Sequence, residues 1–236
     1  MELPIQSVLA DTAVRQVERL LAQRRVVAVM GDRLTLCSFA LAVPIRPALV
    51  GAATTEDEGV ALVERHRPDL LICSADLEIG YGVNLLKRVR RLNLNCQMLI
   101  VLVRETQEVV QEALAAFADG VIFKSSMGSG HGDLISALQT VAEGQVYYPE
   151  QVRTLASSSV QRSDLPPLLE DLTPRELEVV TAVSRGLKNN AIADLLGVSL
   201  ETVKTHVGNA MDKLAARDRT QMAVTALLYG LINPLD

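Results

Sequence analysis

The chain has 236 residues, of which 49% are hydrophobic and only 3% aromatic, and its formal net charge is -5. This composition is globular and excludes a largely disordered chain, while the negative charge argues against nonspecific electrostatic adhesion to nucleic acid. The apolar runs are too short for a membrane helix and no cleavable signal is recognisable, so we expect a cytoplasmic protein without membrane association.

The three cysteines, Cys37, Cys73 and Cys96, are widely spaced and belong to no CxxC pattern or Cys/His cluster. An odd number of scattered cysteines predicts neither a disulfide framework nor a metal site. Buried thiols are favoured over a redox role, and nothing in the sequence indicates a cofactor.

An amphipathic helix is predicted over residues 11–23, within an N-terminal extension that covers residues 1–25. Such a helix can cap a sheet or offer a surface to a protein partner, and the sequence leaves both roles open. The apolar residues on its predicted buried face are Val14, Val17, Leu20 and Leu21.

Short apolar runs alternate with amphipathic stretches across residues 26–143, which is the pattern of a parallel sheet wrapped by helices. Five such units predict an α/β flavodoxin-like domain with a five-stranded parallel sheet, whose functional crevice lies at the carboxyl ends of the strands. Thr55 and Glu58 have the spacing of a capping box for the second helix of this domain. The predicted strands are 26–30, 48–53, 69–73, 98–103 and 120–123, and the predicted helices are 35–43, 56–66, 83–91, 107–117 and 133–143.

Residues 144–171 have the composition of an interdomain linker. Serines occupy 157–159 and prolines occupy 166–167, where the helical pattern has faded. A second domain is therefore expected over residues 172–236.

The second domain opens on an explicit helix signal, because Thr173 can cap, Pro174 fits the first helical position and Glu176 completes a capping box. A second helix over 190–196, a turn that contains glycine, and a third helix over 200–215 follow. A short helix, a tight turn and a longer helix form the helix-turn-helix geometry, which lays the second helix of the pair in the major groove of DNA. We therefore expect an all-α module of four helices.

The third helix of this module has one apolar and one polar face. Val203, Val207 and Met211 recur at i, i+4 and i+8 and should face the core. The polar face has donors and methyl groups of the kinds that contact base edges and phosphates, although a polar face is also the ordinary mark of a solvated helix. The candidate DNA-binding residues on it are Thr202, Lys204, Thr205, His206 and Asn209.

Several short motifs follow one another between residues 172 and 221. They are Leu-Thr-Pro-Arg-Glu at 172–176, Gly-Leu-Lys-Asn at 186–189, Ala-Ile-Ala at 191–193, Thr-Val-Lys-Thr-His-Val at 202–207, Lys-Leu at 213–214 and Arg-Asp-Arg-Thr-Gln at 217–221. With these motifs, residues 172 to about 231 resemble the LuxR/FixJ/NarL family of helix-turn-helix domains. The resemblance implies that Lys204 and its two following neighbours meet the major groove and that Lys188 and Asn189 lie near the DNA backbone. Gly208 departs from the family, which tends to place a long or polar contact residue there.

Placed before such a module, the α/β domain resembles the receiver domain of response regulators in two-component systems. Transfer of a phosphoryl group to a receiver needs a carboxylate nucleophile, carboxylates for Mg²⁺, a small hydroxyl residue near the phosphate, and a lysine. The anchors of the resemblance are Gly31-Asp32 after the first strand, Pro68-Asp69 at the start of the third, Gly82 after the third, and Lys124 after the fifth.

The phosphoacceptor pocket that this resemblance implies is degenerate. Ser74 stands where the family has its aspartate, Gly31 replaces one acid of the metal-binding pair, and Val103 replaces the hydroxyl residue. Only Asp32 and Lys124 remain of the required set. We therefore predict a receiver that is not activated by aspartyl phosphorylation.

Together these features predict a sequence-specific DNA-binding transcription regulator that is not an enzyme. Asp76, two residues beyond Ser74, is the remaining candidate for a shifted phosphoacceptor, and the input signal can be a ligand, a regulatory protein partner, thiol oxidation or none. The alternative is a protein-interaction adaptor that has kept both folds and lost specific DNA binding, because acidic residues outnumber basic ones between 166 and 236. An enzyme is less favoured, since no nucleophile, base and orienting residue can be assembled.

Double-stranded DNA is the expected partner, bound by a homodimer. The final helix, expected over 220–231, has more apolar side chains than one small module can bury, and a symmetric contact between two such helices would bury the excess. The alternative is a closed monomer in which the linker or the α/β domain covers this surface. The apolar residues concerned are Met222, Ala223, Val224, Ala226, Leu227, Leu228 and Leu231.

Overall fold

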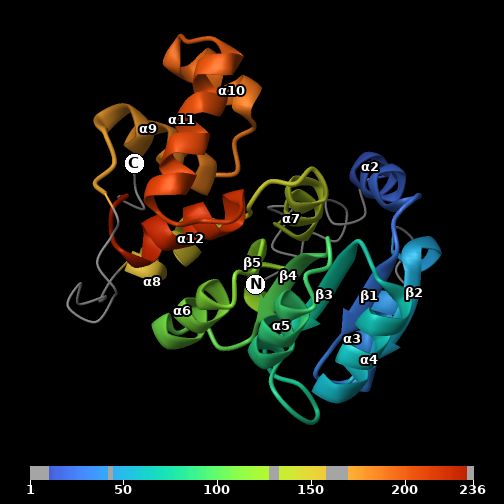
Figure 1. Cartoon of the computed structure of the whole chain (residues 1–236). Coiled ribbons are helices and arrows are strands. Elements are labelled where there is room, and N and C mark those ends of the chain that lie inside the picture. The colour runs from blue at the N-terminus through green and yellow to red at the C-terminus, as the bar shows by residue number, and fades with distance from the viewer. Residues whose placement is uncertain (1–10, 42–44, 128–132, 158–169, 233–236) are drawn as a thin grey trace.

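The computed structural model describes residues 11–41, 45–127, 133–157 and 170–232. A parallel sheet flanked by helices forms the amino-terminal part, and a bundle of four helices lies at its side (Figure 1). This is the predicted combination of a flavodoxin-like α/β domain with an all-α module. Within the part of the chain that the structure describes, no helix combines the length and apolar character needed to cross a bilayer.

The five strands are parallel and lie in the order β2-β1-β3-β4-β5, which is the order of the flavodoxin-like fold. Every side chain of β1, β3 and β5 is buried, which explains why these strands are continuous apolar runs in the sequence. All five strands lie within one residue of their predicted bounds. They are β1 (Val26–Val29), β2 (Leu49–Ala53), β3 (Leu70–Ser74), β4 (Gln97–Leu102) and β5 (Gly120–Phe123).

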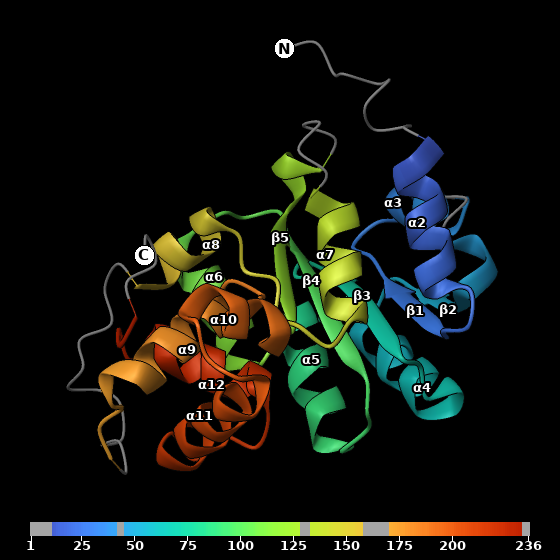
Figure 2. The same ribbon diagram turned by 90° about the horizontal axis from the view of Figure 1, so that it is seen from above.

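Helices cover both faces of the sheet (Figure 2). Successive strand residues point to opposite faces, so Val27 and Leu71 pack with α4, α5 and α6, while Ala28 and Ile72 pack with α2, α3 and α7. The first helix after β1 was predicted to end at residue 43, and residues 42 and 43 lie outside the described residues. The helices are α2 (Asp11–Leu21), α3 (Arg33–Leu41), α4 (Glu56–His66), α5 (Gly82–Arg91), α6 (Gln107–Ala115) and α7 (Asp133–Ala142).

Helix α2 packs on the outside of the α/β domain, against α7. Val17 and Leu21 are buried in the same apolar cluster as Phe39 of α3 and Val141 of α7. Leu20 is half-buried, and the side chain of Val14 lies outside the described residues. The structure therefore gives α2 a packing role on this side of the sheet.

The predicted linker contains a helix that the sequence analysis missed, α8 (Glu150–Ser157). Ahead of it, Tyr147 pairs with Gly120 beside β5, and the hydroxyl of the buried Tyr148 donates to the carbonyl oxygen of Ala118 at 2.6 Å. Helix α8 then packs against α6 and α12. The first half of the predicted linker is thus ordered by contacts with both parts of the chain.

The helical module consists of α9 (Pro174–Ser184), α10 (Asn189–Leu196), α11 (Leu200–Lys213) and α12 (Arg219–Leu228). Between α10 and α11, Gly197 adopts a left-handed conformation with φ of 64°, which glycine tolerates without strain. Ser199 then caps α11 by accepting a hydrogen bond from the backbone N–H of Thr202. This tight turn gives the helix pair the predicted helix-turn-helix geometry.

The two predicted capping boxes differ in the structure. At α9 the box is complete, because Thr173 accepts from the N–H of Glu176 while the Glu176 carboxylate accepts from the N–H of Thr173. At α4 only half of the box forms. Thr55 caps the helix as predicted, but the carboxylate of Glu58 accepts from the Thr55 hydroxyl at 2.9 Å instead of from its N–H.

Helix α12 is covered on both sides within this one chain. It packs against α9 and α11 of its own module and against α6 and α8 of the other part (Figure 1). This is the closed arrangement that the sequence left open as the alternative to a dimer contact. The fully buried side chains of α12 are Met222, Ala223, Val224, Ala226 and Leu227.

A buried hydrogen-bond network fastens α12 to the α/β domain. The Thr220 hydroxyl donates to one carboxylate oxygen of Asp119 at 2.5 Å, and the other oxygen accepts from Arg90 at 3.0 Å and from the N–H of Met98 at 2.8 Å. Burial raises the pKa of Asp119, and these partners oppose that rise. Because a buried polar group is costly without partners, this network favours one orientation of α12 against the sheet.

Candidate functional site

Five candidate DNA-binding residues lie on the outer side of helix α11. Thr202 and His206 are half-buried. The exposed candidates are Lys204, Thr205 and Asn209.

The inner side of α11 differs in part from the prediction. Val203 is fully buried as expected, but Val207 and Met211 are only partly buried, and Ala210 is the second fully buried residue. The exposed Gly208 has open space around it, since nothing lies within 4 Å of the position that a Cβ atom would take. The apolar stripe is therefore rotated slightly from the simple i, i+4 pattern.

The polar groups of α11 are not equally available to a ligand. The Thr205 hydroxyl donates to the carbonyl of Glu201 at 3.0 Å, and the Thr202 hydroxyl lies 2.8 Å from that of Ser199. Lys204 is in an exposed ion pair with Glu201, at 3.2 Å, which is weak and readily exchanged for a phosphate. Asn209 has no side-chain hydrogen bond among the described residues, so its amide is free to contact a base or phosphate.

The other two DNA-binding candidates lie where the turn after α9 enters α10: Lys188 caps α10 and Asn189 is its first residue. The Lys188 ammonium is 2.9 Å from the carboxylate of Glu143, at the end of α7. The Asn189 side-chain oxygen accepts from Arg219 of α12 at 2.9 Å. The structure thus separates the predicted residues into a group on α11 and a group in the α9–α10 turn.

A nearly buried ion pair holds the module together, and the sequence analysis missed it. Lys213 of α11 lies 2.9 Å from the carboxylate of Glu176 of α9, and it also donates to the carbonyl of Asp171. Burial alone would raise the pKa of Glu176, but Lys213 and the Thr173 N–H bring it below its ordinary value. The pair fixes α11 against α9, and its 37-residue separation gave no sequence signal.

At the carboxyl end of the sheet, Ser74 is buried and its hydroxyl lies 3.4 Å from the sulfur of Met30. No base adjoins this hydroxyl in the contacts that the structure describes, so it lacks the activation that a nucleophile needs. Val103, at the end of β4, is about half exposed and offers no hydrogen-bonding side chain.

Gly31 has no room for a larger residue. A Cβ atom there would lie 2.2 Å from the backbone carbonyl oxygen of Asp76, far inside contact distance. An acid at this position would therefore require the loop after β3 to move. The shape of the site itself departs from one that could hold two adjacent acids.

Asp32 caps the first turn of α3 through its carboxylate. Its carboxylate accepts from the Thr35 hydroxyl at 2.6 Å and from the Thr35 N–H at 2.7 Å, and these bonds lower its pKa, with a smaller contribution from the charge of Lys124. Asp32 and Lys124 do not form an ion pair in the described structure. Among the described residues no three His, Cys, Asp or Glu side chains gather as a metal-binding cluster.

Asp76 is already paired. Both of its oxygens accept from Arg104, at 2.7 and 3.3 Å, and the Arg104 guanidinium lies 5.7 Å from the centre of the Tyr81 ring. The Tyr81 hydroxyl in turn donates to Glu112 of α6 at 2.6 Å. These contacts connect the loops after β3 and β4 to α6 and occupy the carboxylate that could act as a shifted phosphoacceptor.

The cysteine beside this pocket, Cys73, is fully buried. Burial raises its pKa far above the ordinary thiol value, and burial also raises the pKa of Cys96 to about 12. Since the thiolate is the reactive form, both groups are poor targets for oxidation. Cys37 of α3 is exposed, so the expectation of a buried thiol is wrong for this residue.

Fold and site together define a two-part transcription regulator, in which an α/β domain precedes a DNA-binding helix-turn-helix. The luxR family of bacterial regulatory proteins matches residues 170–226, and the response regulator receiver domain matches residues 41–139. The second match begins after β1 and so leaves out Gly31 and Asp32.

Two named relatives match most of this chain. The chain is 30% identical over 191 residues to the uncharacterized transcriptional regulatory protein YxjL of Bacillus subtilis, spanning 78% of this chain and 84% of that protein. It is 29% identical over 178 residues to the nitrate/nitrite response regulator protein NarL of Escherichia coli, spanning 75% of this chain and 81% of NarL. The chain belongs to the family of DNA-binding response regulators with a LuxR-type helix-turn-helix domain.

Among solved structures, the RcsB response regulator of Salmonella typhimurium is similar to this chain. One of its structures aligns with a TM-score of 0.49 at 21% identity, over 88% of this chain and 97% of that chain.

Proposed function

We propose that this response regulator binds specific DNA sites as a homodimer and controls transcription without aspartyl phosphorylation. Residues 26–143 would form the receiver-like domain, residues 144–171 the connection and residues 172–236 the reading domain. The observation that carries the proposal is the exposed polar side of α11, with Lys204 and Asn209 available beside a helix-turn-helix of the required geometry. Mapping of the DNA bound by the protein in cells would identify its sites.

The absence of phospho-activation is supported by three features of the strand-end pocket. Ser74 replaces the acceptor, Gly31 has no space for the second acid, and Asp76 is paired with Arg104. A serine hydroxyl cannot form an acyl phosphate, and nothing in this pocket would activate it. We also propose that the chain has no catalytic activity of its own.

Exposure to Mg²⁺ and a small phosphodonor should leave the protein unmodified in intact-mass spectrometry. A Ser74→Asp variant should also stay unmodified, because an acid cannot be added at Gly31 without displacing the carbonyl of Asp76. A stable phosphoryl group on the wild-type protein would contradict this proposal, and its loss in Asp76→Asn would identify the shifted acceptor.

Lys204→Ala should weaken binding to a specific site by about 1 to 3 kcal/mol if Lys204 contacts base edges, and should weaken binding evenly across sequences if it contacts phosphate. Fluorescence anisotropy with cognate and random duplexes separates the two outcomes. Lys87→Ala, which removes an exposed charge from α5, is the matched control and should have little effect.

The second candidate function is a protein-interaction adaptor that no longer binds specific DNA. It is favoured by the excess of acidic over basic residues between 166 and 236 and by the missing side chain at Gly208. An affinity for cognate DNA that is unchanged in Lys204→Ala, or undetectable in the wild type, would support this function instead.

A further inference from the structure

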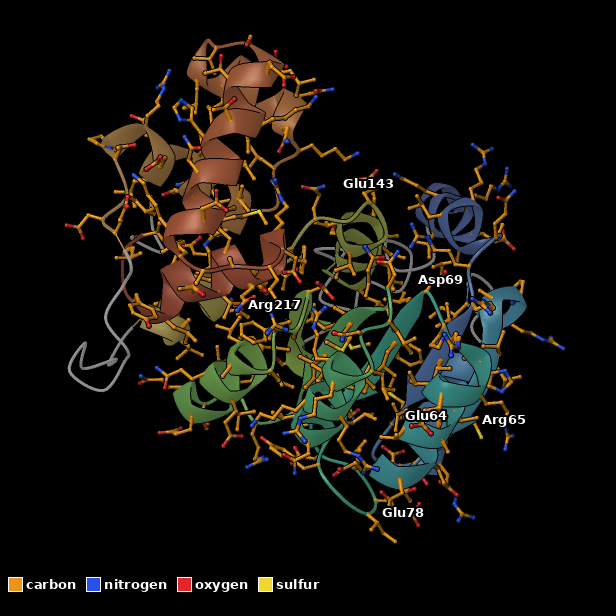
Figure 3. The ribbon with its side chains drawn as sticks, viewed as in Figure 1. Glu64, Arg65, Asp69, Glu78, Glu143 and Arg217 are labelled. Atoms are coloured by element: carbon orange, nitrogen blue, oxygen red, sulfur yellow. The ribbon has the colours of Figure 1, made fainter. Side chains whose placement is uncertain are left out.

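The turn between α9 and α10 lies directly against the α/β domain. A Cβ atom on Gly186, within this turn, would lie 2.6 Å from the carbonyl oxygen of Val146 and 3.2 Å from a methyl group of Thr140. This close approach brings the Lys188 ammonium to 2.9 Å from the Glu143 carboxylate. Figure 3 shows Glu143 at the border of the α/β domain, next to the helical module.

The same turn is shaped by a second cation, Arg219 of α12. Its guanidinium donates to the side-chain oxygen of Asn189 at 2.9 Å and to the backbone carbonyl of Leu187. Burial lowers the pKa of Arg219 to about 10, so it stays charged at neutral pH. Its Nε is buried and unpaired, and no carboxylate is within ion-pair distance of it in the described part of the chain.

The charges at the turn are therefore unbalanced. Lys188 and Arg219 contribute two positive charges, and the carboxylate of Glu143 is the single acid paired with either of them among the described residues. A desolvated guanidinium held only by neutral acceptors favours a nearby anion. In the closed chain, Glu143 of the α/β domain is paired with Lys188, and the described partners of Arg219 are neutral oxygens.

We propose that Glu143 occupies the place of a DNA backbone phosphate at the α9–α10 turn, so that the α/β domain and DNA compete for Lys188. This inference rests on the proposed DNA-binding function, because it assigns a phosphate to the turn. A carboxylate and a phosphate are equivalent partners for an ammonium group. The Lys188 and Glu143 side chains are 55% and 29% exposed, so a phosphate can reach and displace the pair.

The competition takes place at the turn and not over the reading helix. Lys204, Thr205 and Asn209 remain exposed in the closed chain. The residue that follows Arg219 is Thr220, whose hydroxyl donates to the buried Asp119. The α/β domain thus contacts the turn directly through Glu143. It also contacts α12 at Thr220, next to Arg219, whose guanidinium binds the turn.

The test compares full-length variants on a labelled duplex of random sequence at low salt, because phosphate contacts do not depend on the bases. Glu143→Gln keeps the shape of the side chain and removes its charge. We expect it to bind about two- to fivefold more tightly than wild type, which is the range for releasing one exposed ion pair. Glu64→Gln removes the same charge from α4, far from the module in Figure 3, and should bind like wild type.

A second pair of variants separates competition from general repulsion between Glu143 and DNA. Lys188→Ala should bind more weakly than wild type and lower the salt dependence by about one phosphate contact. Adding Glu143→Gln to Lys188→Ala should then give no gain. A gain that persists without Lys188 would mean simple charge repulsion and would overturn the inference.

The outcomes also separate this inference from the proposed function. If wild type binds DNA and Glu143→Gln gives no gain, the inference fails and the proposed function stands. If neither protein binds any duplex, both fail. If Glu143→Gln binds and wild type does not, the inference is supported in its strongest form.

Discussion

Gly82→Ala should destabilise the protein by about 3 kcal/mol or more, because the new methyl group has no space. A Cβ atom at Gly82 would lie 2.0 Å from the carbonyl oxygen of Ser74 and 3.0 Å from the Cα of Ala75. Both are backbone atoms at the end of β3, so neither can rotate away. Urea denaturation followed by circular dichroism measures the loss as a lower midpoint.

The matched control is Gly208→Ala, in the middle of α11. Open space surrounds this position, and alanine has the higher helix propensity, so we expect a gain of about 0.5 to 1 kcal/mol. If alanine is tolerated equally at Gly82 and Gly208, then the close approach of Gly82 to the backbone of Ser74 and Ala75 is absent in solution.

Leu227→Glu should unfold the module or detach it, with a loss of about 4 kcal/mol or more. Leu227 is fully buried in α12, and a carboxylate there would have no partner among the apolar side chains around it. Circular dichroism and thermal melting test the loss directly. Leu228→Glu, at a half-buried neighbour, should be much milder.

This result changes how a dimer contact through α12 can be tested. A probe of such a contact must be the exposed one of the two neighbours Leu227 and Leu228, and the structure makes Leu227 a core residue. A folded Leu227→Glu protein with wild-type stability would show that α12 is not packed between the two parts of the chain. A change in stoichiometry on DNA is informative only for Leu228→Glu.

The strands and most helices were predictable because local chemistry determined them. Buried parallel strands are continuous apolar runs, and Thr55 and Thr173 are capping residues that fix where α4 and α9 begin. Helix α8 was missed because its residues are largely polar and its stability comes from packing against α6 and α12. A composition that is typical of a linker conceals such a helix.

The polar side of α11 was predictable from helical periodicity, and its contacts were not. Glu143 and Lys188 are 45 positions apart, and Asp119 and Thr220 are 101 positions apart, so only the folded chain brings these partners together. The degenerate strand-end pocket was visible from residue identities. The backbone carbonyl oxygen of Asp76 leaves no room for a side chain at Gly31, and this backbone arrangement cannot be deduced from the sequence.

Because α6 and α8 cover one side of α12, a second copy of the protein must compete with them for this surface. The partner in the same chain is joined to α12 by a short connection, so its effective concentration is on the order of millimolar. A second copy of the protein, free in solution at a much lower concentration, cannot match it. Adjacent half-sites on DNA would remove this disadvantage, because they hold two modules within reach of each other. Dimerisation through α12 would then be a property of the DNA complex, and occupancy of a paired site would rise steeply with protein concentration.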